Sequence, residues 1–181
     1  MNLFDLYFTY VKDTESPLVY HRWSLISAVA AHLGRTCWLP FGSARIFPNM
    51  YVMLVGNPGA RKSASIKSVR KVLATTGYTT FSADKTSKEK FLVDLQGDQG
   101  AESTEIITNL FGGSGGLGDP REIFIVADEF NEFVGSGNIE FLSMLGSLWD
   151  WDDPETPYKQ RLKTSKSTSI YQPTINILSG N

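Results

Sequence analysis

A strand, a glycine-rich turn and a helix that begins with Lys-Ser follow one another between residues 51 and 73, and this order constrains the fold more than any other stretch. Tyr51–Val55 is an apolar run that predicts a buried strand. The turn after it reads Gly56-Asn57-Pro58-Gly59-Ala60-Arg61-Lys62-Ser63. The next stretch carries apolar residues at helical spacing, namely Ile66, Val69, Val72 and Leu73. This context predicts a phosphate-binding loop of the Walker A type.

Each part of the predicted loop has a chemical role. Backbone N–H groups of the turn and of the helix N-terminus would surround the phosphates of ATP. The Lys62 ammonium would neutralise charge on the β- and γ-phosphates, and the Ser63 hydroxyl would bind Mg²⁺. Arg61 replaces the second glycine of the pattern GxxxxGK[ST], so the loop needs a conformation there that a side chain tolerates. The predicted nucleotide contacts are Gly56, Asn57, Pro58, Gly59, Ala60, Arg61, Lys62 and Ser63.

A second apolar run, residues 123–127, ends in two carboxylates, Asp128 and Glu129. Alone, this pair would be an ordinary acidic strand end. In this order after a phosphate-binding loop it predicts a Walker B site, where Asp128 holds the Mg²⁺ shell through water and Glu129 polarises the attacking water. Asn181 follows the apolar run 174–178 and is expected to orient that water or sense the γ-phosphate. The alternative for Asn181 is a turn residue after Gly180.

The segment 157–171 contains four cations and no acid, and it follows the acidic stretch 150–155. Its two tyrosine-containing halves meet at a polar centre, which predicts a β-hairpin with a basic tip. The alternatives are a nucleic-acid contact along the phosphate backbone and a merely solvated hairpin. The candidate DNA-binding residues are Lys159, Arg161, Lys163 and Lys166.

Composition sets the remaining bounds. With 181 residues, 41% of them hydrophobic, and a net charge of −2, the chain fits one domain and no overall affinity for polyanions. The single cysteine, Cys37, is expected to be a small buried hydrophobe. No intrachain disulfide can form, which fits a reducing cytoplasm. Neither a signal peptide nor a membrane span is predicted, and His21 and His32 are expected to be structural.

Periodicity places helices at 3–11, at 17–33 after a Ser16 N-cap, at 87–96 and at 138–149, with a hairpin over 35–47 and a strand at 78–82. The glycine cluster 112–118 is expected to be a surface loop. Apolar strands that alternate with helices predict a parallel sheet covered on both faces, a three-layer αβα fold. The expected inward residues of the second helix are Trp23, Ile26, Val29, Ala30 and Leu33, and those of the last are Ile139, Leu142, Leu145, Leu148 and Trp149.

Taken together, the loop at 56–63, the acids closing 123–129 and the Asn-ended strand at 174–181 resemble the core of a AAA+ ATPase. The chain looks closer to the phage- and plasmid-borne primase-helicase ATPases related to superfamily 3 helicases. That resemblance also rests on the arginine-bearing loop and on the block from His21-Arg22-Trp23 through 38–42 to 46–52. On this basis residues 1–49 are an N-terminal helical and hairpin extension, and residues 50–181 are the ATPase core.

The resemblance implies a hexameric ring of identical subunits that hydrolyses ATP at its interfaces and moves on single-stranded DNA, in the host cytoplasm if the chain is phage-encoded. The basic hairpin would line the central pore. The family's fifth core strand and its later sensor or lid elements are not found in this sequence, and no trans-acting arginine finger can be assigned. Two alternatives stay open: a P-loop ATPase that loads or remodels proteins, and an assembly subunit that binds nucleotide without turnover.

Overall fold

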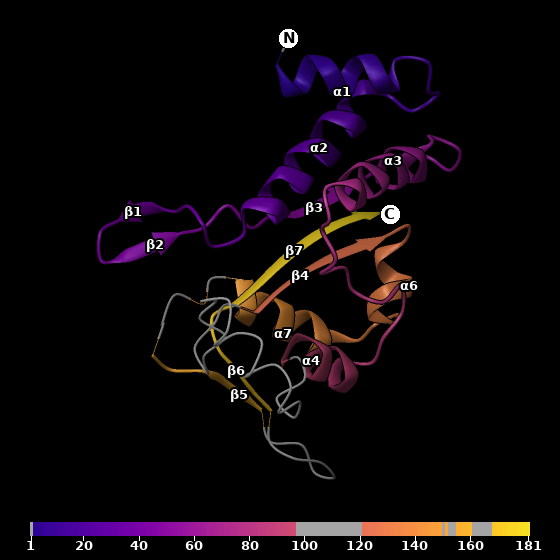
Figure 1. The fold of residues 1–181 in the computed structure, drawn as a ribbon. Coiled ribbons are helices and arrows are strands. Elements are labelled where there is room, and N and C mark those ends of the chain that lie inside the picture. Colours follow the sequence, from indigo (N-terminus) through magenta and orange to yellow (C-terminus); the bar gives the residue numbers. More distant parts are fainter. Residues whose placement is uncertain (1, 97–120, 150, 152–154, 161–167) are drawn as a thin grey trace.

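The central sheet is parallel, and its middle strand is the last one along the chain. The computed structural model describes residues 2–96, 121–149, 151, 155–160 and 168–181. Strands β3 (Tyr51–Leu54) and β4 (Arg121–Ala127) each pair in parallel with β7 (Pro173–Gly180), which lies between them (Figure 1). Because all three strands run the same way, their carboxyl ends meet at one edge of the sheet.

Helices cover both faces of this sheet, as the sequence predicts. Helices α2 (Leu18–Leu33) and α3 (Lys62–Thr75) pack on one face, and α4 (Lys88–Gln96), α6 (Phe130–Val134) and α7 (Ile139–Trp149) pack on the other (Figure 1). The side chains of β4 contribute to both apolar layers, because successive side chains of a strand point to opposite faces of the sheet. Phe124 and Val126 join the α2–α3 cluster, whereas Ile123 and Ile125 join the other cluster. No helix in the described ranges is both long and apolar enough to cross a membrane.

The strand predicted at 78–82 is reduced to a single parallel bridge. Phe81 bridges Phe124 of β4, with hydrogen bonds from Ser82 N to Phe124 O at 2.9 Å and from Phe124 N to Thr80 O at 2.8 Å. The Phe81 N–H donates to the Thr79 carbonyl at 2.9 Å. This tight local turn diverts the chain from the ladder, so the prediction of a full strand was wrong in extent.

The first two helices pack against each other through Tyr7, Val11 and Leu25. Helix α1 (Leu3–Val11) begins with a capping box between Asn2 and Asp5. Ser16, the predicted N-cap of α2, is buried and makes no capping bond. Pro17 takes the cap position instead, and its carbonyl accepts the N–H groups of Tyr20 and His21 at 3.0 and 3.4 Å.

The inward faces of two helices differ from the prediction. In α2, Trp23 and Leu33 are exposed, and the buried residues facing α3 and the sheet are small, including Ser24, Ser27, Ala28 and Ala31. Small side chains permit the close approach of α2 to its neighbours, and hydrophobicity alone does not reveal this. In α7, Ile139, Leu142 and Trp149 are exposed, whereas the buried residues are Phe141, Met144, Leu145 and Leu148.

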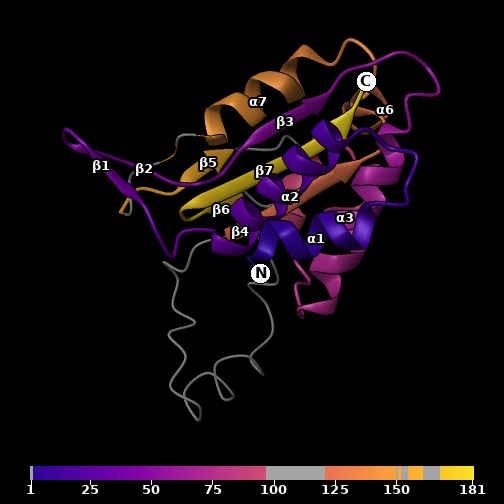
Figure 2. The ribbon, with the colours of Figure 1, turned by 90° about the horizontal axis from the view of Figure 1, so that it is seen from above.

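Two hairpins flank the sheet. The first, β1 (Leu39–Phe41) with β2 (Ala44–Ile46), projects from the body (Figures 1 and 2). Cys37 lies before it and is exposed, so its predicted burial was wrong. The second hairpin, β5 (Tyr158–Gln160) with β6 (Thr168–Ile170), confirms the arms predicted within 157–171. Arg161, Lys163, Lys166 and the glycine cluster 112–118 lie outside the described residues.

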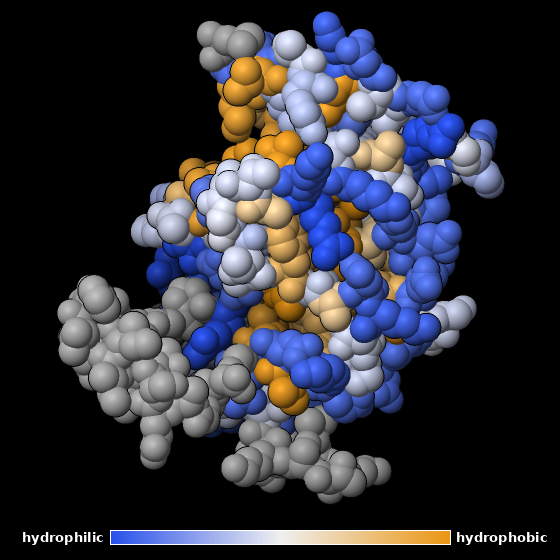
Figure 3. All heavy atoms as spheres, turned by 45° about the vertical axis from the view of Figure 1, so that its right-hand side comes forward, coloured by the Kyte–Doolittle hydropathy of each residue, from blue (hydrophilic) through white to orange (hydrophobic). Residues whose placement is uncertain are grey.

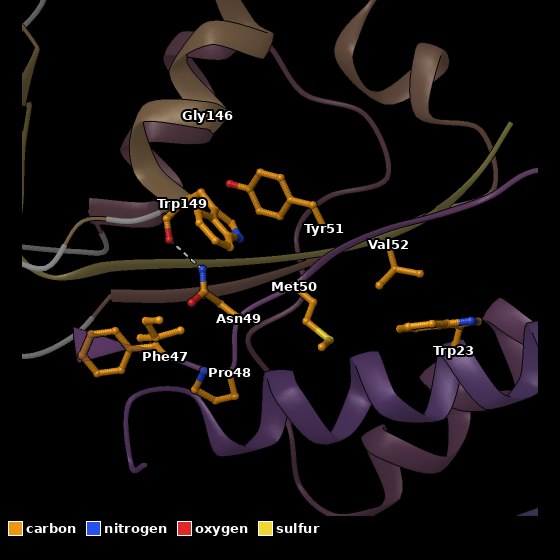
Figure 4. Close-up of a pocket in the computed structure, with 10 residues that line it drawn as sticks. Trp23, Phe47, Pro48, Asn49, Met50, Tyr51, Val52, Gly146 and Trp149 are labelled. Atoms are coloured by element: carbon orange, nitrogen blue, oxygen red, sulfur yellow. Dashed lines mark hydrogen bonds between the residues drawn. The ribbon is translucent and has the colours of Figure 1, made fainter. Parts of the chain in front are cut away.

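An apolar groove follows the outer edge of β3. Within the described ranges, β3 pairs only with β7, so its other edge is open. The groove, of about 630 Å³, lies between Trp23 of α2 and Trp149 of α7, with Met50, Tyr51 and Val52 along its floor (Figure 4). The Asn49 amide donates to the Trp149 carbonyl at 2.7 Å and ties the start of β3 to the end of α7.

Candidate nucleotide-binding site

One cavity of about 890 Å³ brings together the loop after β3, the acids after β4 and the residue after β7. Seven of the eight predicted loop residues line it, all but Asn57, and Asp128, Glu129 and Asn181 line it as well. These residues are distant in sequence and become neighbours because β7 lies between β3 and β4. Hydrophilic side chains gather on this side of the molecule, with apolar ones visible among them (Figure 3).

The loop reaches its shape through two left-handed residues. Gly59 has φ +84°, which glycine adopts freely, and Arg61 has φ +58°. For a residue with a side chain this conformation costs roughly 1–2 kcal/mol. The Arg61 Nε atom pairs with Glu15 Oε2 at 2.6 Å, but both side chains are mostly exposed and the pair stabilises little. The loop therefore accommodates arginine at the second glycine position at a small conformational cost.

Lys62 is the first residue of α3, and its side chain folds back over the loop. The ammonium donates to the Gly56 carbonyl at 2.5 Å and to the Asn57 carbonyl at 3.4 Å. These bonds hold a positive charge beside the N-terminus of α3, whose unpaired N–H groups and dipole also favour an anion. Loop, lysine and helix end thus place a positive charge and free N–H groups on one wall of the cavity.

Helix α2 supports the start of the loop through a residue that the sequence did not single out. The Tyr20 hydroxyl donates to the Val55 carbonyl at 3.0 Å. A Cβ atom on Gly56 would overlap the Tyr20 hydroxyl oxygen. Close approach of a side chain, rather than a left-handed backbone, therefore explains why glycine occupies position 56. Only the packing of α2 on the loop reveals this contact.

The two acids after β4 are both exposed and have different surroundings. Asp128 Oδ2 lies 2.9 Å from the ammonium of Lys67. Glu129 is the extended N-cap residue of α6, and its side chain makes no capping bond. Glu132, in the first turn of α6, lines the same cavity. Sequence reasoning missed Lys67 and Glu132, although Lys67 follows Ser63 by one helical turn and so shares its face of α3.

The end of β7 fits closely between the other two segments. A Cβ on Gly180 would lie 2.6 Å from the Asp128 carbonyl oxygen and 3.7 Å from the Lys62 Cβ, so this position has room only for glycine. Asn181 follows, and its N–H donates to the Leu54 carbonyl at 3.1 Å. Its side-chain oxygen accepts a long bond of 3.5 Å from the Asn131 amide. Asn181 thus contacts both the end of β3, just before the loop, and helix α6.

The oxygen donors at the site suit magnesium. Mg²⁺ is usually bound through one or two carboxylates together with phosphate oxygens and water. Ser63 and Asp128 supply a hydroxyl and a carboxylate to the same cavity. Among the residues that the structure describes, no group of three or more His, Cys, Asp and Glu residues is arranged to hold a metal ion.

The predicted DNA contacts lie elsewhere. Lys159 is exposed on β5, and the other three cations fall outside the described residues. The β5–β6 hairpin precedes the amino end of β7, whereas the cavity lies at the carboxyl end (Figure 1). The described arms of the hairpin and the cavity therefore lie at opposite ends of β7.

Comparison of the chain with protein-family models, with curated proteins and with solved structures gave no match. The residues and their geometry therefore carry the functional argument.

Proposed function

We propose that this chain is the core of a P-loop ATPase of the AAA+ type, with ATP and Mg²⁺ bound at the cavity around Lys62. The observation that carries the proposal is the strand order β3-β7-β4. That order places the glycine-rich loop, the paired acids and the terminal asparagine around one cavity. A chance match to the loop pattern alone would not bring the other two groups to the same edge of the sheet.

Binding follows from the charges and donors of the loop. The N–H groups of the loop and of the first turn of α3 would hold the phosphates, and Lys62 would offset their charge. Ser63 and Asp128 would hold Mg²⁺, which neutralises charge on the phosphate oxygens when it is bound. Gly59 has open space where a side chain would begin, so the backbone there is free to approach the ligand closely.

Hydrolysis would depend on the side chains on the β4 and β7 side of the cavity. Glu129 is exposed to the cavity and makes no capping bond, so its carboxylate is available to orient a water molecule and accept its proton. Asn181, from the neighbouring strand, would hold the same water or the terminal phosphate by hydrogen bonding. Glu129 and Asn181 follow β4 and β7, which pair with each other, so the sheet limits the distance between the two side chains.

We further propose that the ATPase serves a helicase that moves on single-stranded DNA as a hexameric ring. The resemblance to primase-helicase ATPases supports this step, and so does the exposed Lys159 on a hairpin directly before β7. The two alternatives are a loader that acts on proteins and an assembly subunit that binds ATP without turnover.

Nucleotide binding is the first test. Titration with a fluorescent ATP analogue and Mg²⁺ is expected to show saturable binding that Lys62→Ala weakens about 100-fold, the size of one charge-assisted contact. Lys71→Ala is the matched control, because Lys71 lies on the same helix and does not line the cavity. Equal binding by the Lys62→Ala variant would refute the proposed site.

Hydrolysis measured with and without single-stranded DNA separates the three functions. DNA-stimulated turnover is expected for the helicase. ATP hydrolysis at the same rate with and without DNA identifies the loader. ATP binding without hydrolysis identifies the assembly subunit. The assay is run over a range of protein concentrations, because a ring with interface active sites turns over faster per subunit as it assembles.

A further inference from the structure

One carboxylate in the cavity is positioned for two different cations. The Lys67 ammonium lies 2.9 Å from Asp128 Oδ2, and the same carboxylate is the proposed Mg²⁺ contact. Lys67 stands one helical turn after Ser63, the other proposed Mg²⁺ contact, and Lys67 and Asp128 both line the cavity. The Lys67 and Asp128 side chains are 70% and 42% exposed, so the pair can exchange partners readily.

The other charged groups around the cavity are engaged differently. Lys62 donates to loop carbonyls, and Arg61 pairs with Glu15 outside the strand ends. Glu129 and Glu132 add negative charge to the cavity wall. Among the described residues, Lys67 is thus the cation that forms an ion pair with one of the acids after β4.

We propose that Lys67 is a built-in competitor of the divalent cation, whose ammonium must leave Asp128 before that carboxylate can join a metal shell. This inference rests on the proposed function and specifies how the same site is regulated. Competition raises the metal concentration needed to fill the site. Nucleotide phosphates offer the displaced ammonium a new anionic partner within the same cavity. Metal and nucleotide therefore bind together more readily than the metal binds alone.

The experiment measures Mn²⁺ binding to the nucleotide-free full chain by electron paramagnetic resonance of the free ion. Lys67→Met is expected to tighten Mn²⁺ binding about two- to fivefold, the effect of removing one exposed ion pair as a competitor. Lys67→Arg keeps the charge and is expected to stay near the wild-type affinity. Lys71→Met removes the same charge one turn further along α3, outside the cavity, and controls for long-range attraction.

A double-mutant comparison localises the effect to one carboxylate. In an Asp128→Asn background, Lys67→Met is expected to give no gain in Mn²⁺ affinity. An unchanged affinity in Lys67→Met alone, an equal gain in Lys71→Met, or no detectable Mn²⁺ binding by Lys67→Met would overturn the proposal. Failure of the proposed function looks different, because then the wild-type chain binds no ATP analogue, whereas the nucleotide-free Mn²⁺ titration still decides the role of Lys67.

Discussion

The hydroxyl oxygen of Tyr20 occupies the space where a Cβ atom would lie on Gly56, and it donates to the carbonyl of the preceding residue, Val55. Helix α2 thereby fixes the point where β3 turns into the loop. It also packs in the same apolar cluster as α3 and the sheet, so it supports this end of the sheet from one face.

This contact predicts a coupled pair of substitutions. We expect Gly56→Ala to lower the free energy of unfolding by about 1–3 kcal/mol, because the added methyl group displaces the hydroxyl. Tyr20→Phe alone should cost about 0.5–1.5 kcal/mol, because it removes the hydrogen bond. The double variant should cost less than the sum, since the methyl group would then meet the ring carbon at a tolerable 3.4 Å. Urea unfolding measures all three, and strict additivity would contradict the contact.

Glu129→Gln is expected to retain ATP binding and to slow hydrolysis about 10²–10⁴-fold, because the amide cannot accept a proton from water. Asp128→Asn should instead raise the Mg²⁺ concentration needed for turnover. Glu132→Gln is the matched control, with the same chemical change on the wall of the same cavity. Wild-type rates in both the Glu129 and Asp128 variants would show that the acids are structural.

Arg61→Gly should leave nucleotide binding intact. Glycine removes the cost of the left-handed backbone, and the exposed pair with Glu15 is worth little, so stability should change by no more than about 1 kcal/mol. Arg61→Ala keeps the strain and removes the pair, and it should be the less stable of the two. A large drop in ATP affinity in both variants would assign Arg61 a direct phosphate contact.

Stability should decrease on acidification because of His21. Its ring nitrogens contact the hydroxyls of Tyr7 at 3.1 Å and Thr14 at 2.7 Å, and burial lowers its pKa below the ordinary 6.5. The unfolded chain therefore binds this proton more readily than the folded chain does. The contribution of neutral His21 to the free energy of unfolding is complete above about pH 6.5 and is lost as the pH falls below it. Urea unfolding from pH 7.5 to 5 should show this slope. His21→Gln should flatten the slope.

Neutralising Lys159, Arg161, Lys163 and Lys166 together tests the helicase proposal. For every phosphate contact that the variant removes, the salt dependence of single-stranded DNA binding should fall by about one unit of logarithmic slope. Affinity should fall alike for all sequences, because backbone contacts carry no base information. ATP binding should persist, since the hairpin and the cavity lie at opposite ends of β7. An unchanged affinity and slope would favour the loader or the assembly subunit.

Local order in the chain explains which elements the sequence revealed. The loop, α3 and the acids after β4 were predictable because their strand, turn and helix signals are consecutive. The inward face of α2 was not, because small serine and alanine side chains mark close packing rather than hydrophobicity. Helix α6 was missed, since its five residues are too few to show a period and Glu129 provides no capping bond.

Contacts between segments distant in the chain explain what the sequence could not reveal about the site. Tyr20 reaches Val55 from another layer, and Lys67 meets Asp128 only because α3 packs beside the end of β4. Position 180 has no room for a side chain because β7 lies between the other two strands, and the sequence does not show this neighbourhood. Such residues carry no local motif, and their roles emerge from the assembled sheet.

No strand among the described residues pairs with the outer edge of β3, and this bears on how the purified chain behaves in concentrated solution. Residues Tyr51–Leu54 include no charged side chain, and natural proteins commonly use charges, proline or a covering segment to stop an exposed strand from pairing with another molecule. Trp23 and Trp149 beside this edge add exposed apolar surface. We therefore expect association between molecules of the isolated chain to begin at this strand, however well the rest of the core is packed.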